Sequence, residues 1–381
     1  MAHLLTLPPE LLDLVLSLLA PPVPSLLRLR AVPDHLLSAS PICSLKAVSL
    51  VAWRLRVLSQ PHLFSHARYE LSDQHRFLTF VEENGLGRHI HSLVVSVRLA
   101  TEQPSRWWMA LLEHVNPEIL TIIAPPCFLA QLAHVGLEDT HPWAFDLPFQ
   151  ILHLRRPPQK ISRFQAASAP HTTSGSDTTT ESASIFTACP WTEILFNEGS
   201  SLQGYRNDGY FLLRLPSFMD HWGYADFFDT SALPYSQTAI LRLTSFHYTS
   251  IFPFYNHTNL VLRMIRNMAN LRHLSVQLAP SPGDLTRIFN EDSNLGHMDP
   301  SDPWMELDTS YSLISHCVKY LGQEGKLEEF QTWDFELEAL RDSILEKMDS
   351  RLRGRWSHRG MGVWTRLGPL DDVTVLDTES D

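Results

Sequence analysis

The sequence predicts a mixed α/β protein in which an N-terminal helical module precedes a curved array of strands and helices. Short apolar runs of strand length recur from about residue 71 onward, and helix-like segments stand beside several of them. The first sixty-eight residues differ in charge, because they carry six basic and three acidic residues in a chain whose net charge is −12. These observations favour separate units with separate partners.

Alternating strands and helices predict βα units and a mainly parallel sheet. Strands are predicted over residues 92–97, 119–123, 149–154, 193–196, 239–243 and 271–276. Helices are predicted over residues 105–115, 128–135, 260–268, 310–321 and 336–351. Residues 271–276 have the LxxLxL shape of a leucine-rich repeat, but the strands start at uneven intervals and lack an Asn or Cys ladder. We therefore expect a degenerate, leucine-rich-repeat-like curved α/β array.

Five regions follow from composition and pattern. A Ser/Thr-rich stretch interrupts the array and is expected to be a disordered loop, and the acidic end of the chain is expected to be a solvated tail. The predicted regions are a helical module at 1–66, the first part of the α/β domain at 67–164, the loop at 165–187, the second part of the α/β domain at 188–370 and the tail at 371–381.

The first predicted helix has more apolar surface than a small module can bury. Thr6 is a suitable N-cap, and Pro8 and Pro9 suit a first helical turn. From residue 10 to residue 19 the polar side chains fall in one narrow stripe, and seven of the last nine residues are apolar. A surface helix normally buries a stripe of little more than 100°. The surplus apolar face is therefore expected to bind a partner.

A second helical segment is predicted from residue 45 to residue 59. Apolar residues recur there at helical spacing, whereas Lys46, Arg54 and Arg56 are expected to face water. Gln60 and Pro61 are predicted to end this helix, after which Leu63 and Phe64 would fold back as an apolar plug.

These two segments resemble the F-box as fungal F-box proteins carry it. The resemblance rests on LPPELL at residues 7–12 paired with LKAVSLVAWRLRVLSQPHLF at residues 45–64. It extends into residues 77–93, which look like the passage into a leucine-rich-repeat-like domain. Residues 20–44 hold five prolines and are longer than the usual connection, with an extra helical turn placed at Leu26–Leu29. The path of this insertion stays open.

The resemblance implies a three-helix module that binds the adaptor Skp1 and, through it, a cullin and a RING protein. It implies that the chain is a substrate-recognition subunit of an SCF-type ubiquitin ligase, with a protein target bound by the C-terminal domain. The implied Skp1-binding residues are Leu7, Pro8, Leu11, Leu12, Val15, Leu16, Leu50, Val51 and Trp53.

Motifs for catalysis and cofactors are missing from the sequence. It contains no GxSxG, P-loop, GxGxxG or HExxH motif, and the close pair His89 and His91 has no neighbouring third ligand. We expect no enzyme activity, no cofactor and no metal site. The aromatic segment 221–229 is expected to pack into the core or, if exposed, to recognise the target.

Partner and compartment follow from charge, cysteine and hydropathy. The net charge of −12 argues against nucleic acid, and four widely spaced cysteines fit a reducing compartment. Prolines and polar residues interrupt the apolar stretches 4–23 and 119–135, so neither is predicted to cross a membrane. A cytoplasmic or nuclear protein is expected. Three alternatives stay open: a scaffold that binds the adaptor without a ligase role, an enzyme of unrecognised type, and a helical hairpin at Leu4–Phe64 that only caps the α/β array.

Overall fold

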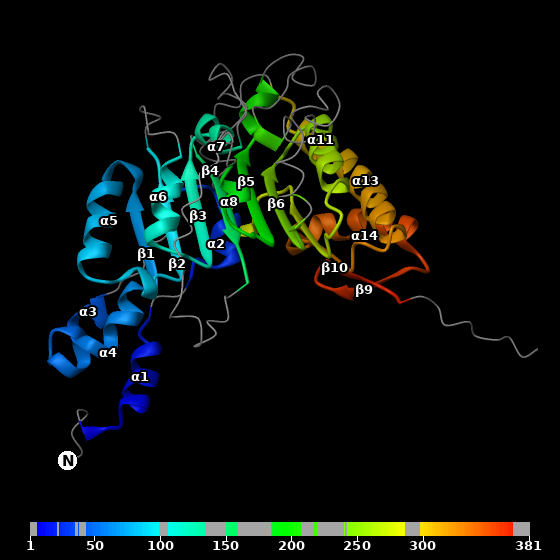
Figure 1. The fold of residues 1–381 in the computed structure, drawn as a ribbon. Coiled ribbons are helices and arrows are strands. Elements are labelled where there is room, and N and C mark those ends of the chain that lie inside the picture. Colours follow the sequence, from blue (N-terminus) through cyan, green and yellow to red (C-terminus); the bar gives the residue numbers. More distant parts are fainter. Residues whose placement is uncertain are drawn as a thin grey trace, which may run out of the picture.

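A ten-stranded mixed sheet forms the body of the protein (Figure 1). The structure, a computed structural model, describes residues 6–20, 23–34, 37, 43–98, 106–133, 149–157, 184–206, 217–219, 240, 242–285 and 298–368. The strands are β1 (His66–Glu70), β2 (Ser92–Ser96), β3 (Ile119–Ala124), β4 (Gln150–Arg155), β5 (Glu193–Ser200), β6 (Ser245–Ile251), β7 (His273–Gln277), β8 (Glu329–Thr332), β9 (Trp356–Gly360) and β10 (Val363–Arg366).

The strands follow one another across the sheet in chain order, except that β10 lies between β8 and β9. Neighbours pair in parallel from β1 to β3 and from β5 to β8. Strand β4 runs antiparallel to both of its neighbours, and β10 is antiparallel to β8 and β9. The mixed α/β class and the mostly parallel sheet are therefore as predicted.

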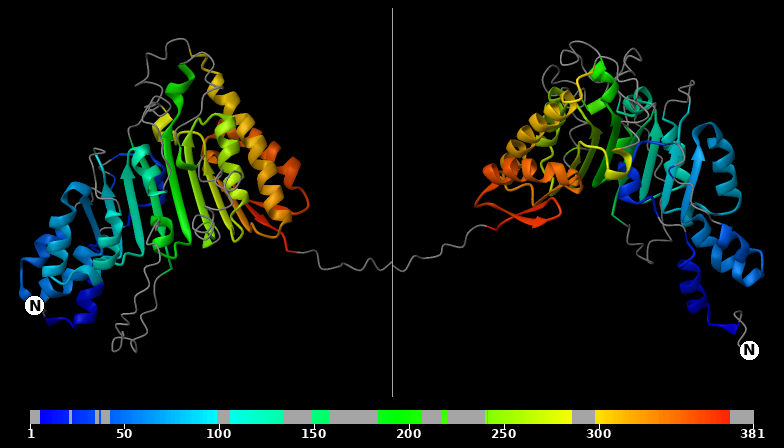
Figure 2. Two further views of the ribbon diagram at one scale, coloured as in Figure 1. Left: turned by 45° about the horizontal axis from the view of Figure 1, so that its top comes forward. Right: turned by 180° about the vertical axis from the view of Figure 1, so that it is seen from behind.

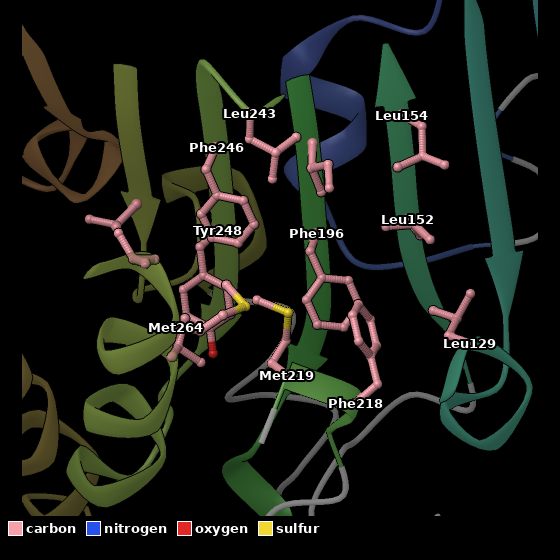
Figure 3. Packing of buried hydrophobic residues seen from close by; sticks show 14 of the residues in the cluster. Leu129, Leu152, Leu154, Phe196, Phe218, Met219, Leu243, Phe246, Tyr248 and Met264 are labelled. Carbon is pink, nitrogen blue, oxygen red and sulfur yellow. The ribbon is translucent and has the colours of Figure 1, made fainter. Parts of the chain in front are cut away.

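Most helices cover one face of the sheet (Figure 2). They are α5 (Gln74–Glu83), α6 (Trp107–His114), α7 (Pro126–Leu132), α8 (Ile185–Ala188), α11 (Tyr255–Arg266), α13 (Asp302–Gln323) and α14 (Glu338–Leu352), with 3₁₀ turns at η2 (Leu71–Asp73), η3 (Gly87–His89), η5 (Leu202–Arg206) and η7 (Trp333–Glu336). Alternate strand residues such as Phe196, Phe246 and Tyr248 point into this layer and meet Met264 of α11 and Phe218 (Figure 3). These buried aromatic rings form much of the main core.

Three N-terminal helices lie beyond the β1 edge of the sheet (Figure 1). We call α1 (Pro9–Ser17), α3 (Cys43–Ser49) and α4 (Trp53–Phe64) the helical module. Helix α4 contacts α1, α3, β1 and η3, so it joins the module to the sheet. Phe64 at its end packs on the main core, with its ring 6.0 Å from that of Phe80.

Helix α2 (Leu26–Arg30) leaves the module and lies on the opposite face of the sheet (Figure 2). Leu29 and Leu37 form a second, smaller apolar cluster there, with side chains of four strands. The four strand residues in this cluster are Val94, Ile123, Ile151 and Leu195. Strands β2 to β5 are thus buried on both faces, which explains why their sequences are continuous apolar runs rather than alternating ones.

Several predicted boundaries are wrong for identifiable reasons. The single helix predicted from residue 45 is two helices, because Ala52 is extended (φ −156°, ψ 151°) and separates α3 from α4. Pro61 lies inside α4, so it does not end the helix. The strand predicted at 239–243 is wrong because Ile240 and Arg242 are helical, and the strand follows at β6.

The predicted loop boundary at residue 187 is wrong, because α8 (Ile185–Ala188) begins before it. Ile185 and Phe186 belong to α8, where both are buried in the main core. The extra helical turn expected at Leu26–Leu29 is confirmed as α2. Segments 165–183, 221–229 and 371–381 lie outside the described residues.

Candidate partner-binding surface on the helical module

Helix α1 has one buried and one exposed apolar stripe. Pro9 occupies the first helical position, where no amide hydrogen is needed. Leu12 and Leu16, one turn apart, are 1% and 2% exposed and face the interior of the module. Leu11 and Leu14 point elsewhere and are largely exposed. The helix therefore buries only part of its apolar surface within the chain.

Two polar contacts fix the register of α1 against α4. The Arg54 guanidinium donates from Nη2 to the carbonyl oxygen of Leu7 at 2.9 Å. Six residues further along the first segment and eight further along α4, Nε2 of His62 lies 2.8 Å from Oδ1 of Asp13. The two helices therefore run parallel, and the start of α1 lies beside the start of α4.

The corner between α3 and α4 adds further exposed apolar side chains. Leu50 is 82% exposed, Val51 71% and Trp53 77%. This corner immediately precedes α4, so the register places it at the same end of the module as the start of α1. An exposed Trp is rare on a surface without a partner, and aromatic residues are enriched at the centres of protein interfaces. We call the exposed side chains of both segments the apolar surface; it comprises Leu11, Leu14, Val15, Leu18, Leu50, Val51 and Trp53.

The structure divides the nine residues implied as Skp1-binding. Pro8, Leu11, Val15, Leu50, Val51 and Trp53 are exposed, and Leu7 is half-buried. Leu12 and Leu16 are buried inside the module, where α1 packs against α4. Leu14 and Leu18 were not among the nine, yet they are 60% and 80% exposed. Their spacing of three and seven residues from Leu11 was the available signal.

Three hydrogen-bonded side chains on the face of the sheet that carries α2 have the residue types of a nucleophilic triad. Oγ of Ser275 lies 2.6 Å from Nδ1 of His247, whose Nε2 lies 3.5 Å from Oε1 of Glu193. Ser275 is 3% exposed in the middle of β7, where the backbone amides are used by the sheet. A reacting carbonyl would find neither access nor oxyanion donors there. The chain of contacts instead links β5, β6 and β7.

Two acids are fully enclosed in the α/β domain. Burial opposes ionisation of Glu198, but His257 and the hydroxyls of Ser217 and Tyr248 hold its pKa below the ordinary 4.5. Burial raises the pKa of Asp334 to about 6, although that carboxylate accepts hydrogen bonds from two backbone amides and a tyrosine. Both carboxylates join the sheet to neighbouring elements, and both are buried in this structure.

Among the residues that the structure describes, no three His, Cys, Asp or Glu side chains gather as metal ligands. Within the described ranges, none of the helices combines the length and apolarity that crossing a bilayer requires.

Comparison with known proteins adds no assignment. No family model, curated protein or solved structure matches the chain. The apolar surface of the helical module therefore has to be interpreted from its own geometry.

Proposed function

We propose that the chain is the substrate-recognition subunit of an SCF-type ubiquitin ligase. The helical module acts as an F-box and binds Skp1 through the apolar surface, and the α/β domain binds the protein target. The observation that carries this proposal is the exposure of apolar side chains on both segments of the two-part sequence motif, at α1 and at the corner before α4.

The energetics of the apolar surface favour a bound partner. Full burial of one leucine or valine side chain contributes about 1.5–3 kcal/mol. Six exposed leucine and valine side chains, together with Trp53, occur on α1 and at the corner before α4, and a group of exposed apolar side chains of this size normally marks an interaction site. Trp53, the largest of them, is the expected anchor of the interface.

The arrangement of the α/β domain supports the second half of the proposal. Strands that follow in chain order beneath one main layer of helices resemble a solenoid of the leucine-rich-repeat kind, which uses its sheet face or its loops for binding. The antiparallel β4 and the uneven helices make the array irregular. The chain itself performs no chemistry; it holds a target close to the ubiquitin-charged enzyme and raises its local concentration.

Capture of purified Skp1 and cullin by the full-length chain tests the proposal. The wild-type chain should retain both proteins, and the double variant Leu11→Asp plus Leu14→Asp should retain neither. Leu27→Asp is the matched control, because Leu27 in α2 is 59% exposed, like Leu14, but lies outside the module. Equal capture by the double variant would refute the assignment of the surface. Capture of Skp1 without cullin would instead indicate a scaffold that uses the same adaptor.

A further inference from the structure

The sheet face opposite the main helices binds residues 25–31 of the chain itself. Asn197, on β5 and 1% exposed, donates from Nδ2 to the carbonyl oxygens of Leu29 and Ala31 at 2.9 and 2.8 Å. Leu29 is completely buried against Val94, Ile123 and Ile151. The sheet therefore holds both the backbone and one aliphatic side chain of this segment.

A second part of the same face holds the guanidinium of Arg30. Its Cζ lies 3.5 Å from the ring centroid of Trp333, and its Nη1 donates to Oε1 of Gln277 at 3.3 Å. Burial lowers the pKa of Arg30 from 12.5 to about 10, and Glu336 and Asp334 lie near enough to offset part of this effect by favouring its positive charge. An aromatic ring, an amide oxygen and nearby carboxylates are the groups that recognise arginine in proteins.

The segment leaves two polar atoms of this face without partners. Thr249 pairs with Asn197 on one side and Gln277 on the other, so its side chain lies on the same face between the two anchors. Oγ1 of Thr249 is buried and has no hydrogen-bond partner, and the same is true of Nε1 of Trp333. Unpaired buried polar atoms are costly and uncommon, so the site is incompletely satisfied by residues 25–31.

We propose that this face is a receptor site for a peptide segment with an aliphatic residue followed by arginine, and that Leu29 and Arg30 occupy it as an internal ligand. A target protein that presents the same pair, together with groups for Thr249 and Trp333, displaces residues 25–31. The identification of the displacing partner as a ligase target rests on the proposed function; the receptor site itself does not.

The internal ligand is held in a way that permits displacement. Helix α2 is five residues long, and a helix of that length has little stability of its own. Its anchors are one asparagine, one aliphatic contact and one arginine, all of which a separate peptide can reproduce. The segment has the advantage of being tethered, so it competes at a high effective concentration.

Binding of a fluorescein-labelled copy of residues 23–33 tests the proposal in full-length chains. The Arg30→Ala chain, whose internal ligand has lost an anchor, should bind the peptide at least about tenfold more tightly than the wild-type chain. The Arg28→Ala chain should behave like wild type, because Arg28 belongs to the same helix but is exposed. If Arg30→Ala fails to fold by near-ultraviolet circular dichroism, Arg30→Lys replaces it, since lysine keeps the charge but loses planar stacking.

Variant peptides test the chemistry of the site. Replacing Arg30 in the peptide should weaken its binding to the Arg30→Ala chain about tenfold or more, whereas replacing Arg28 should leave it unchanged. Equal binding of the two variant peptides, or no binding of any peptide to the Arg30→Ala chain, would show that residues 25–31 are only a fixed structural strap. Capture of Skp1 by the Arg30→Ala chain is measured separately. A chain without a peptide receptor site can therefore be distinguished from a chain that does not bind Skp1.

Discussion

Two leucines of α1 that are two residues apart, Leu12 and Leu14, should respond to substitution in opposite ways. Leu12 is 1% exposed inside the module, whereas Leu14 is 60% exposed on the apolar surface. Leu12→Ala creates a cavity and should lower the free energy of unfolding by about 2–5 kcal/mol. Leu14→Ala should change it by less than about 0.5 kcal/mol, because little of that side chain is buried in the free chain.

Leu14→Ala, which should hardly change stability, should weaken the binding of Skp1. If a partner covers the 60% of Leu14 that is exposed, the side chain contributes about 1–2 kcal/mol to binding. Leu14→Ala should therefore weaken Skp1 binding by about 5–30-fold, as measured by biolayer interferometry. Leu27→Ala, at an equally exposed leucine of α2, should leave both quantities unchanged. The reasoning is refuted if Leu14→Ala unfolds the chain, or if Leu14→Ala and Leu27→Ala have the same affinity.

Three further predictions concern the α/β domain. Burial lowers the pKa of His153 from 6.5 to about 4. As the pH falls, the unfolded chain therefore takes up a proton at this histidine before the folded chain does, and stability should fall by about 3 kcal/mol between pH 6.5 and pH 4. Denaturant titrations at each pH should show this loss in wild type and not in His153→Gln. Glu198→Ala should lower the free energy of unfolding by about 3 kcal/mol or more near pH 7. The stability that Glu198 contributes in wild type should disappear as the pH falls below 4.5 and through the depressed pKa of this carboxyl, which urea melts of both chains can follow. Gly362 and Gly354 both have positive φ, of 73° and 83°, but of these two only Gly362 would place a Cβ 2.3 Å from a backbone oxygen. Gly362→Ala should therefore lower the free energy of unfolding by more than the about 1–2 kcal/mol expected for Gly354→Ala. Equal melting temperatures of the two variants would contradict this expectation.

Local periodicity was enough to predict the class of fold and most helices of the α/β domain. The helix predicted over residues 310–321 lies inside α13, and the one predicted over 336–351 overlaps α14 except at its first two residues, because each helix buries an apolar stripe. Strand β6 was missed because its sequence, SFHYTSI, alternates polar and aromatic residues, whereas the more apolar stretch before it has helical residues at 240 and 242. An apolar run alone does not separate a buried helical turn from a strand.

Features that depend on distant parts of the chain could not be predicted. Seven apolar residues among nine gave no reason to separate Leu12 from Leu14, because the position of α4 decides which stripe is buried. The path of residues 25–31 depends on Asn197 and Trp333, which are more than 160 residues away. Composition placed the exposed surface on the correct segments, and tertiary contacts selected its residues.

Hydrogen–deuterium exchange of the full-length chain with and without purified Skp1 would show whether the apolar surface is the contact with the adaptor. The predicted result is slower exchange in α1 and at residues 50–53 in the complex, with little change in α11, α13 and α14. Complex formation that leaves α1 and the corner before α4 unprotected would contradict it, and so would the lack of any complex at micromolar concentrations of both proteins.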